Sequence, residues 1–104
     1  MTWSILFITC PNFKSANKIT EHLLKEKLVA CVNILPVIKS EYWFKGKIEK
    51  HSEVLMIVKT KSNLYGHIEK EVKKLHPYNI PEIISFKVDK GNKDYLNWIS
   101  SVTK

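Results

Sequence analysis

The stretch from Ala30 to Lys61 constrains the fold most, because it predicts one very long β-hairpin. Lys45-Gly46 separates two extended runs, and glycine supplies the positive φ that tight hairpin turns need. Each arm has about 14 residues and spans about 45 Å at roughly 3.4 Å per residue. A compact domain of about 100 residues has a radius of gyration of only about 13 Å. Part of the hairpin is therefore expected to project beyond its own core.

The tip of this hairpin carries three consecutive aromatic residues, Tyr42, Trp43 and Phe44. Soluble monomers rarely expose an apolar patch of this kind, so we expect the three side chains to form an interface with another copy of the chain. The alternative is two shorter strand pairs, with Pro36 breaking the first arm at a bulge or an edge.

Periodicity predicts the elements outside the hairpin. In chain order they are a strand at Trp3–Thr9, a helix at Phe13–Leu28, a helix capped by Ser62 and ended by His76-Pro77, a strand at Glu82–Val88 and a helix at Lys93–Thr103. With the hairpin strands the order is βαββαβ plus a C-terminal helix. We therefore expect an α+β, ferredoxin-like single domain over residues 1–104, with both main helices on one face of an antiparallel sheet. The other face is left open.

The formal net charge of +7 suggests a nucleic-acid partner, but the residue types argue against one. All seventeen basic residues are lysine, and arginine is the residue that grips phosphate and reads guanine with paired donors. The lysines are scattered among glutamates, as on a solvated surface. The strand Glu53–Lys59 also lacks the aromatic residues with which an RNA-recognition module stacks bases. We expect no nucleic-acid partner.

No membrane partner is expected either, because the longest apolar run, Val54–Val58, is far shorter than the roughly 20 residues that span a bilayer. The first nine residues resemble a strand and not a signal peptide, which predicts a cytoplasmic protein. Cys10 and Cys31 lack close C-x-x-C spacing and are interpreted as reduced, buried thiols.

No catalytic residue is predicted. An acylphosphatase-type enzyme on this topology needs an arginine to hold phosphate, and the chain has none. Thr9, Ser52 and Ser85 lie outside any nucleophile motif such as G-x-S-x-G.

Two histidines are candidates for metal binding. His67 and Glu71 are one helical turn apart, but two ligands are fewer than the three or four of a zinc-type site, so they are interpreted as exposed neighbours. His76 ends a helix beside Pro81-Glu82, a corner that also supplies a carboxylate, and we retain it as a candidate ligand.

Glu53 and Lys59 are charged residues in an otherwise apolar strand. They are six positions apart and so share one face of that strand. Because a buried charge needs a partner, they either pair across an interface or bind something there.

Several motifs together resemble the CutA divalent-cation-tolerance proteins from about Trp3 to Ile99. They are Thr9 with Pro11; Glu26–Ile34; Ser40 with Tyr42, Trp43 and Gly46–Ile48; Glu53 with Ile57, Lys59 and Thr60; His76–Tyr78 with Pro81–Ile83; and Tyr95-Leu96 with Trp98. The resemblance implies a homotrimer in which long hairpins wrap neighbouring subunits, with Tyr42, Trp43 and Phe44 at the interface. It also implies a non-enzymatic role in tolerance of copper and other divalent cations.

For such a role the candidate metal ligands are His76 and Cys10, and no cofactor is expected to be required for folding. The alternative function is a PII-like sensor. In that case Lys59, Glu53, Tyr42 and Glu82 converge on a small anionic ligand in a cleft between subunits.

Overall fold

The computed structural model describes residues 1–104 and contains four strands and three α-helices. Their bounds are β1 Trp3–Cys10, α1 Phe13–Lys25, β2 Cys31–Phe44, β3 Lys47–Lys61, α2 Tyr65–Leu75, β4 Ile83–Lys87 and α3 Lys93–Val102. A short 3-10 turn, Ser62–Leu64, precedes α2. The predicted element order is confirmed.

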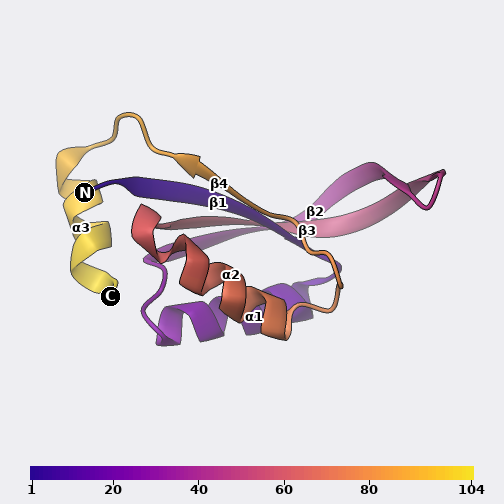
Figure 1. Cartoon of the computed structure of the whole chain (residues 1–104), viewed down its shortest axis with the longest axis horizontal. Helices are drawn as coiled ribbons and strands as arrows, with labels where there is room; N and C mark the ends of the chain where they lie inside the picture. Colours follow the sequence, from indigo (N-terminus) through magenta and orange to yellow (C-terminus); the bar gives the residue numbers. More distant parts are fainter.

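The strands form one antiparallel sheet in the order β2-β3-β1-β4, the arrangement expected of a ferredoxin-like domain. In the central pair Trp3 lies opposite Lys61, and Cys10 lies opposite Val54. Figure 1 shows α1 and α2 together on one side of this sheet. The expected α+β class and the one-sided helix layer are confirmed.

The core lies between the helices and the side of the sheet that they cover. Even-numbered residues of β1 and β3 point into it, because successive side chains of a strand alternate between its faces. The buried apolar side chains of this cluster are Leu6, Ile8, Cys10, Ala16, Ile19, Leu23, Leu28, Val29, Val54, Met56, Val58, Ile68 and Val72.

The opposite side of the sheet, here called the open face, is apolar but not covered. It carries Ile5, Phe7, Leu55, Ile57, Ile84 and Phe86, none of them buried. Ile84 and Phe86 are 48% and 49% exposed, and the rings of Phe7 and Phe86 meet edge to face at 5.1 Å. A single chain thus leaves a row of apolar side chains in contact with water.

β2 and β3 form the predicted long hairpin, which extends well beyond the helices in Figure 1 and gives the molecule its longest dimension of 44 Å. Lys45 and Gly46 turn the chain with φ of 49° and 76°. Trp43 is 74% exposed at the tip. The two strands pair along the whole hairpin, but their register shifts between Leu35 and Ile38. The hairpin is therefore continuous and contains a bulge at Pro36, as the alternative had considered.

Several boundaries differ from the sequence-based expectation, among them the ends of β1 at Cys10 and of α3 at Val102, each by one residue. α1 ends at Lys25 and not at Leu28, because Lys27 adopts a left-handed φ of 56°. Ser62 does not cap α2, because its hydroxyl is hydrogen-bonded to Ser4 Oγ at 2.6 Å. β4 is one residue shorter at each end than predicted.

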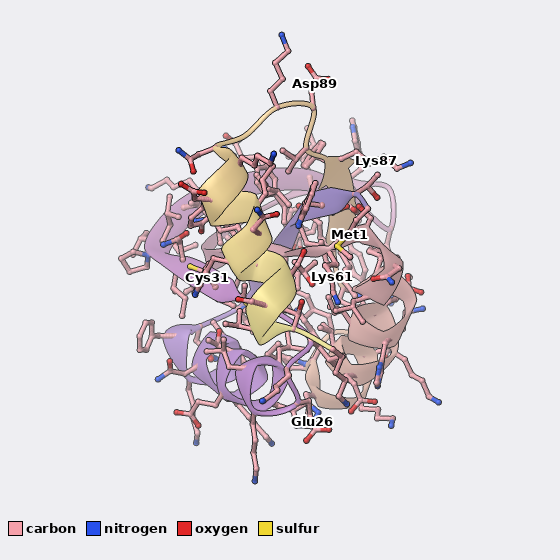
Figure 2. The ribbon with its side chains drawn as sticks, turned by 90° about the vertical axis from the view of Figure 1, so that its left-hand side faces the viewer. Met1, Glu26, Cys31, Lys61, Lys87 and Asp89 are labelled. Atoms are coloured by element: carbon pink, nitrogen blue, oxygen red, sulfur yellow. The ribbon has the colours of Figure 1, made fainter.

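α3 lies across the end of the sheet that is remote from the hairpin, with Met1 and Lys61 to its right in Figure 2. The indole Nε1 of Trp3 donates to Ser100 Oγ at 3.0 Å, and Lys61 Nζ donates to the carbonyl of Lys104. These contacts attach the last helix to β1 and β3.

Candidate metal site at the end of β1

Cys10 and His76, which are 66 residues apart in sequence, lie together in the structure. Cys10 is the last residue of β1, and His76 directly follows α2. Cys10 Sγ lies 3.7 Å from His76 Nε2 and also 3.7 Å from Met56 Sδ on β3. Cys10 and Met56 are fully buried and His76 is 8% exposed, so water has little access to these three donors.

Hydrogen bonds define the protonation of His76. Its Nδ1 accepts the backbone N–H of Tyr78 at 3.1 Å, so the ring proton is on Nε2. Nε2 donates that proton to the carbonyl oxygen of Thr9 at 2.7 Å. The ring is therefore held as a neutral imidazole between two backbone groups, and both of its nitrogens are occupied.

Cys10 is a protonated thiol. Burial, opposed by a hydrogen bond with Ser15 and aided by the charge of Glu53, raises the pKa of Cys10 to about 11. Without its proton, this sulfur would be a soft metal ligand shielded from water in the buried cluster of Cys10, His76 and Met56, here called the pocket. An oxidant or an electrophile has little access to the sulfur.

Next to this pocket is a second polar group formed by Glu53, Tyr78 and Glu82. Tyr78 Oη donates to Glu53 Oε2 at 2.9 Å, and Glu53 is only 7% exposed. Burial and this hydrogen bond raise the pKa of Tyr78 to about 12. Burial and the charge of Glu53 also raise the pKa of Glu82. No ion pair involves either carboxylate.

The structure does not bring Lys59 to these carboxylates within one chain. Six residues of strand, about 20 Å, separate Lys59 from Glu53. Lys59 Nζ is hydrogen-bonded to Asn33 Oδ1 and lies 4.0 Å from Cys31 Sγ. Tyr42 lies on the projecting hairpin, where its ring is 5.7 Å from that of His51. Convergence of the four predicted cleft residues would thus require a second copy.

Glu71 has a different partner from the one its sequence spacing suggested. Its Oε1 accepts a hydrogen bond from His22 Nε2 of α1 at 2.8 Å, and its Oε2 accepts one from Lys74 Nζ at 3.0 Å. His67 remains exposed. Hydrogen bonds from His22 and Lys74 lower the pKa of Glu71 to about 2. This group joins α1 to α2 across the outside of the helix layer.

Sequence reasoning missed Met56 and Tyr78. Met56 was read only as one of five apolar residues of a central strand, and nothing local marks it as a neighbour of Cys10. The sequence does mark Tyr78, because it ends the His76-Pro77-Tyr78 motif. Its hydrogen-bond partner Glu53 lies 25 positions away, and no local pattern connects the two. Cys31, expected to be buried, is only half-buried on the open face.

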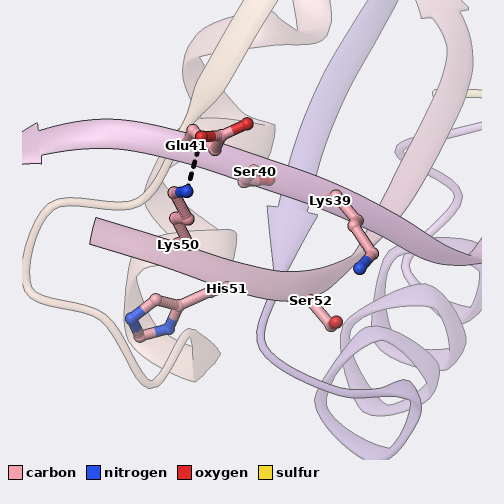
Figure 3. A pocket seen from close by; sticks show the side chains of 6 residues that line it. All are labelled: Lys39, Ser40, Glu41, Lys50, His51 and Ser52. Atoms are coloured by element: carbon pink, nitrogen blue, oxygen red, sulfur yellow. Dashed lines mark ion pairs between the residues drawn. The ribbon is translucent and has the colours of Figure 1, made fainter. Parts of the chain in front are cut away.

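One depression on the hairpin is a shallow polar pocket of about 180 Å³. Figure 3 shows its lining residues, Lys39, Ser40, Glu41, Lys50, His51 and Ser52. Lys50 Nζ and Glu41 Oε1 form an exposed ion pair of 3.7 Å there. None of the six side chains is buried, so this pocket holds no preorganised ligand group.

No three side chains of the types His, Cys, Asp and Glu are grouped so as to hold a metal ion. None of the helices is long and apolar enough to cross a membrane.

Comparison with known proteins places the chain among a well-defined set of relatives. The model of the CutA1 divalent ion tolerance protein family matches residues 4–102. The mouse Protein CutA is 46% identical over 101 residues, which cover 97% of this chain and 57% of the mouse protein. The chain thus spans a little more than half the length of this relative. The divalent-cation tolerance protein CutA of Pyrococcus horikoshii is 44% identical, with 96% of this chain and 97% of that protein covered.

Solved structures agree with these matches. The Cut A1 protein of Thermus thermophilus superposes with a TM-score of 0.96 at 36% identity, covering 98% of this chain and 99% of that one. A structure from Archaeoglobus fulgidus, described as a periplasmic divalent cation tolerance protein CutA, gives 0.95 at 40% identity, with the same two coverages of 98% and 99%.

Proposed function

Because the chain belongs to the CutA1 divalent ion tolerance family, we propose that it is a non-enzymatic homotrimer that binds divalent cations, copper in particular, at Cys10 and His76. The observation that carries this proposal is the buried contact of 3.7 Å between Cys10 Sγ and His76 Nε2. Thiolate and imidazole are both ligands for copper.

Metal binding at this pair requires the loss of one proton and the movement of another. The Cys10 thiol must ionise, and the proton on His76 Nε2 must move to Nδ1, which breaks the hydrogen bonds of the ring with Thr9 and with the Tyr78 N–H. Copper therefore competes with a proton for the Cys10 sulfur, and its affinity should fall as the pH falls.

Copper titration of the purified protein tests the metal function. We expect the double variant Cys10→Ala/His76→Ala to lose copper binding and Cys31→Ala to retain it, since Cys31 lies outside the pocket. Unchanged copper affinity in the double variant would remove both proposed ligands. The physiological role is tested separately, by comparing growth of cells with and without the gene in elevated copper.

Two surfaces support the trimer. The open face leaves Ile84 and Phe86 about half exposed, and the hairpin tip exposes Trp43 and Phe44 by 74% and 52%. A second sheet face packed on the first and a hairpin laid over a neighbour would cover both surfaces. The aromatic residues Tyr42, Trp43 and Phe44 are thus the proposed interface anchors.

Light scattering at low micromolar concentration with a chelator present measures the assembly. A mass three times 12.1 kDa is expected. A mass of one chain would contradict the trimer, whatever the result of the copper titration.

The comparisons give no support to the alternative function of a PII-like sensor of a small anion. Within one chain the only basic member of the proposed cleft, Lys59, is also about 20 Å from Glu53 along the strand. Both observations count against an anion site formed by these residues.

A cytoplasmic location is part of the proposal. Cell fractionation with compartment markers tests it directly. Recovery in a periplasmic fraction, the compartment given for the Archaeoglobus fulgidus relative, would overturn it.

A further inference from the structure

Met56 presents a second sulfur to the pocket of Cys10 and His76. It lies on β3, opposite Ile8 of the neighbouring strand β1, and its side chain faces the helix layer, as does that of Cys10. The Met56 Sδ and Cys10 Sγ atoms are 3.7 Å apart, and both residues are fully buried. Cys10 Sγ is thus equally distant from a thioether and from an imidazole nitrogen.

In the protein without metal these separations are those of weak thiol hydrogen bonds, and they also match the spacing of donors that share one ion. Metal–sulfur bonds of about 2.3 Å and metal–nitrogen bonds of about 2.0 Å place two donors about 3.5–4 Å apart at angles of about 110–120°. Both separations from Cys10 Sγ, to Met56 Sδ and to His76 Nε2, are 3.7 Å. Little rearrangement of the two sulfurs is needed to bring a small ion between them.

The donor types favour a particular oxidation state. Thiolate and thioether sulfurs are soft ligands and select Cu(I), whereas carboxylates suit harder ions. The nearby carboxylate of Glu53 is bonded to Tyr78. Cu(I) bound to a thiolate carries no net charge, so its burial costs much less than that of a divalent ion with one thiolate.

We propose that Met56 is a copper ligand beside Cys10 and that this pocket takes copper as Cu(I). The inference rests on the metal-binding function proposed above and adds a ligand and an oxidation state to it. As the copper–sulfur bond forms, the thiol proton of Cys10 leaves to solvent. His76 joins the two sulfurs in its other neutral tautomer, in which the ring proton has moved from Nε2 to Nδ1 and the hydrogen bond from the Tyr78 N–H is broken.

The first test is Cu(I) affinity, measured without oxygen by competition with a chromophoric Cu(I) chelator. We expect Met56→Leu to weaken Cu(I) binding by about a hundredfold, since even outer partners of metal ligands change affinity about 10- to 100-fold. Leu has nearly the volume of Met, so the core should tolerate it, which thermal unfolding checks. Zinc binding, measured in parallel, should change much less. Cys31→Ala is the matched control and should bind Cu(I) as the wild type does.

A second test observes the bond itself and needs no variant. In protein labelled with selenomethionine and loaded with Cu(I), X-ray absorption at the selenium edge should show copper in the first shell of about half of the selenium, because the chain has two methionines. Absence of copper around selenium in copper-loaded protein, or unchanged affinity in Met56→Leu, would overturn the role of Met56 and leave copper binding intact. A wild-type protein that binds no copper in either oxidation state would instead contradict the proposed function.

Discussion

Glu71 shows how a single carboxylate connects two helices. It accepts hydrogen bonds from His22 of α1 and from Lys74 of its own helix. The pKa of Glu71 is lowered to about 2, so the folded protein binds its proton less tightly than the unfolded chain does. The stabilisation is complete above the ordinary carboxyl pKa and is lost as the pH falls through the folded value.

We therefore expect Glu71→Gln to lower the melting temperature at neutral pH, and the difference from the wild type to shrink between pH 4.5 and about 2. Thermal unfolding recorded over this pH range measures the effect. Glu21→Gln, on the exposed side of α1, is the control and should show no such trend. A difference that is constant with pH would assign the loss to packing and not to charge.

Tyr78 holds the only hydrogen bond that Glu53 makes through its side chain. Tyr78→Phe should destabilise the protein by about 1–3 kcal/mol, because a nearly buried carboxylate loses its donor. Urea unfolding gives this free energy. Tyr95→Phe, at an exposed tyrosine of α3, should be close to neutral. Equal effects of the two substitutions would argue that the Glu53 contact adds no stability.

At the scale of elements, the sequence of the hairpin turn is not the one that its backbone conformation favours most. Lys45 and Gly46 both have positive φ, the requirement of a type I′ turn, and Asn-Gly is the sequence that such turns prefer. Lys45→Asn should stabilise the chain by about 0.5 kcal/mol, and Gly46→Ala should destabilise it by about 1 kcal/mol. Unfolding midpoints of the two variants check the opposite signs. Lys47→Asn, just outside the turn, is the control and should not stabilise.

At the scale of the whole molecule, assembly should dominate stability. If the aromatic tip anchors a neighbour, the melting temperature must rise with protein concentration, since association stabilises only folded chains. Trp43→Ala should weaken this dependence and lower the melting temperature. Calorimetry over a hundredfold range of concentration measures both effects. Trp43 is 74% exposed in the single chain. If Trp43→Ala changes neither the melting temperature nor its dependence on concentration, the tip stabilises no interface.

The sequence predicts local structure better than the contacts of the pocket. Gly46 and the apolar periodicities define the hairpin and the helix layer, because turn type and amphipathic patterns are set by neighbouring residues. The contact of Met56 with Cys10 spans 46 positions and that of Tyr78 with Glu53 spans 25, so only the folded chain brings them together. Spacing within α2 predicts only that Glu71 and His67 are exposed neighbours, and no local pattern marks the partner of Glu71, His22, which lies on the other helix.

The bulge between Leu35 and Ile38 shifts the alternation of side chains along β2 by one residue. Before it, Leu35 lies opposite Leu55, so odd positions of β2 share the side of the open face. Beyond it, Tyr42 lies opposite Glu49 and Trp43 opposite Ile48, so even positions take over that side. One inserted residue thereby decides that Tyr42 and Phe44 continue the open face while Trp43 turns away from it. A deletion of Val37 would exchange the two sides of the β2 arm out to the turn and leave its composition otherwise unchanged.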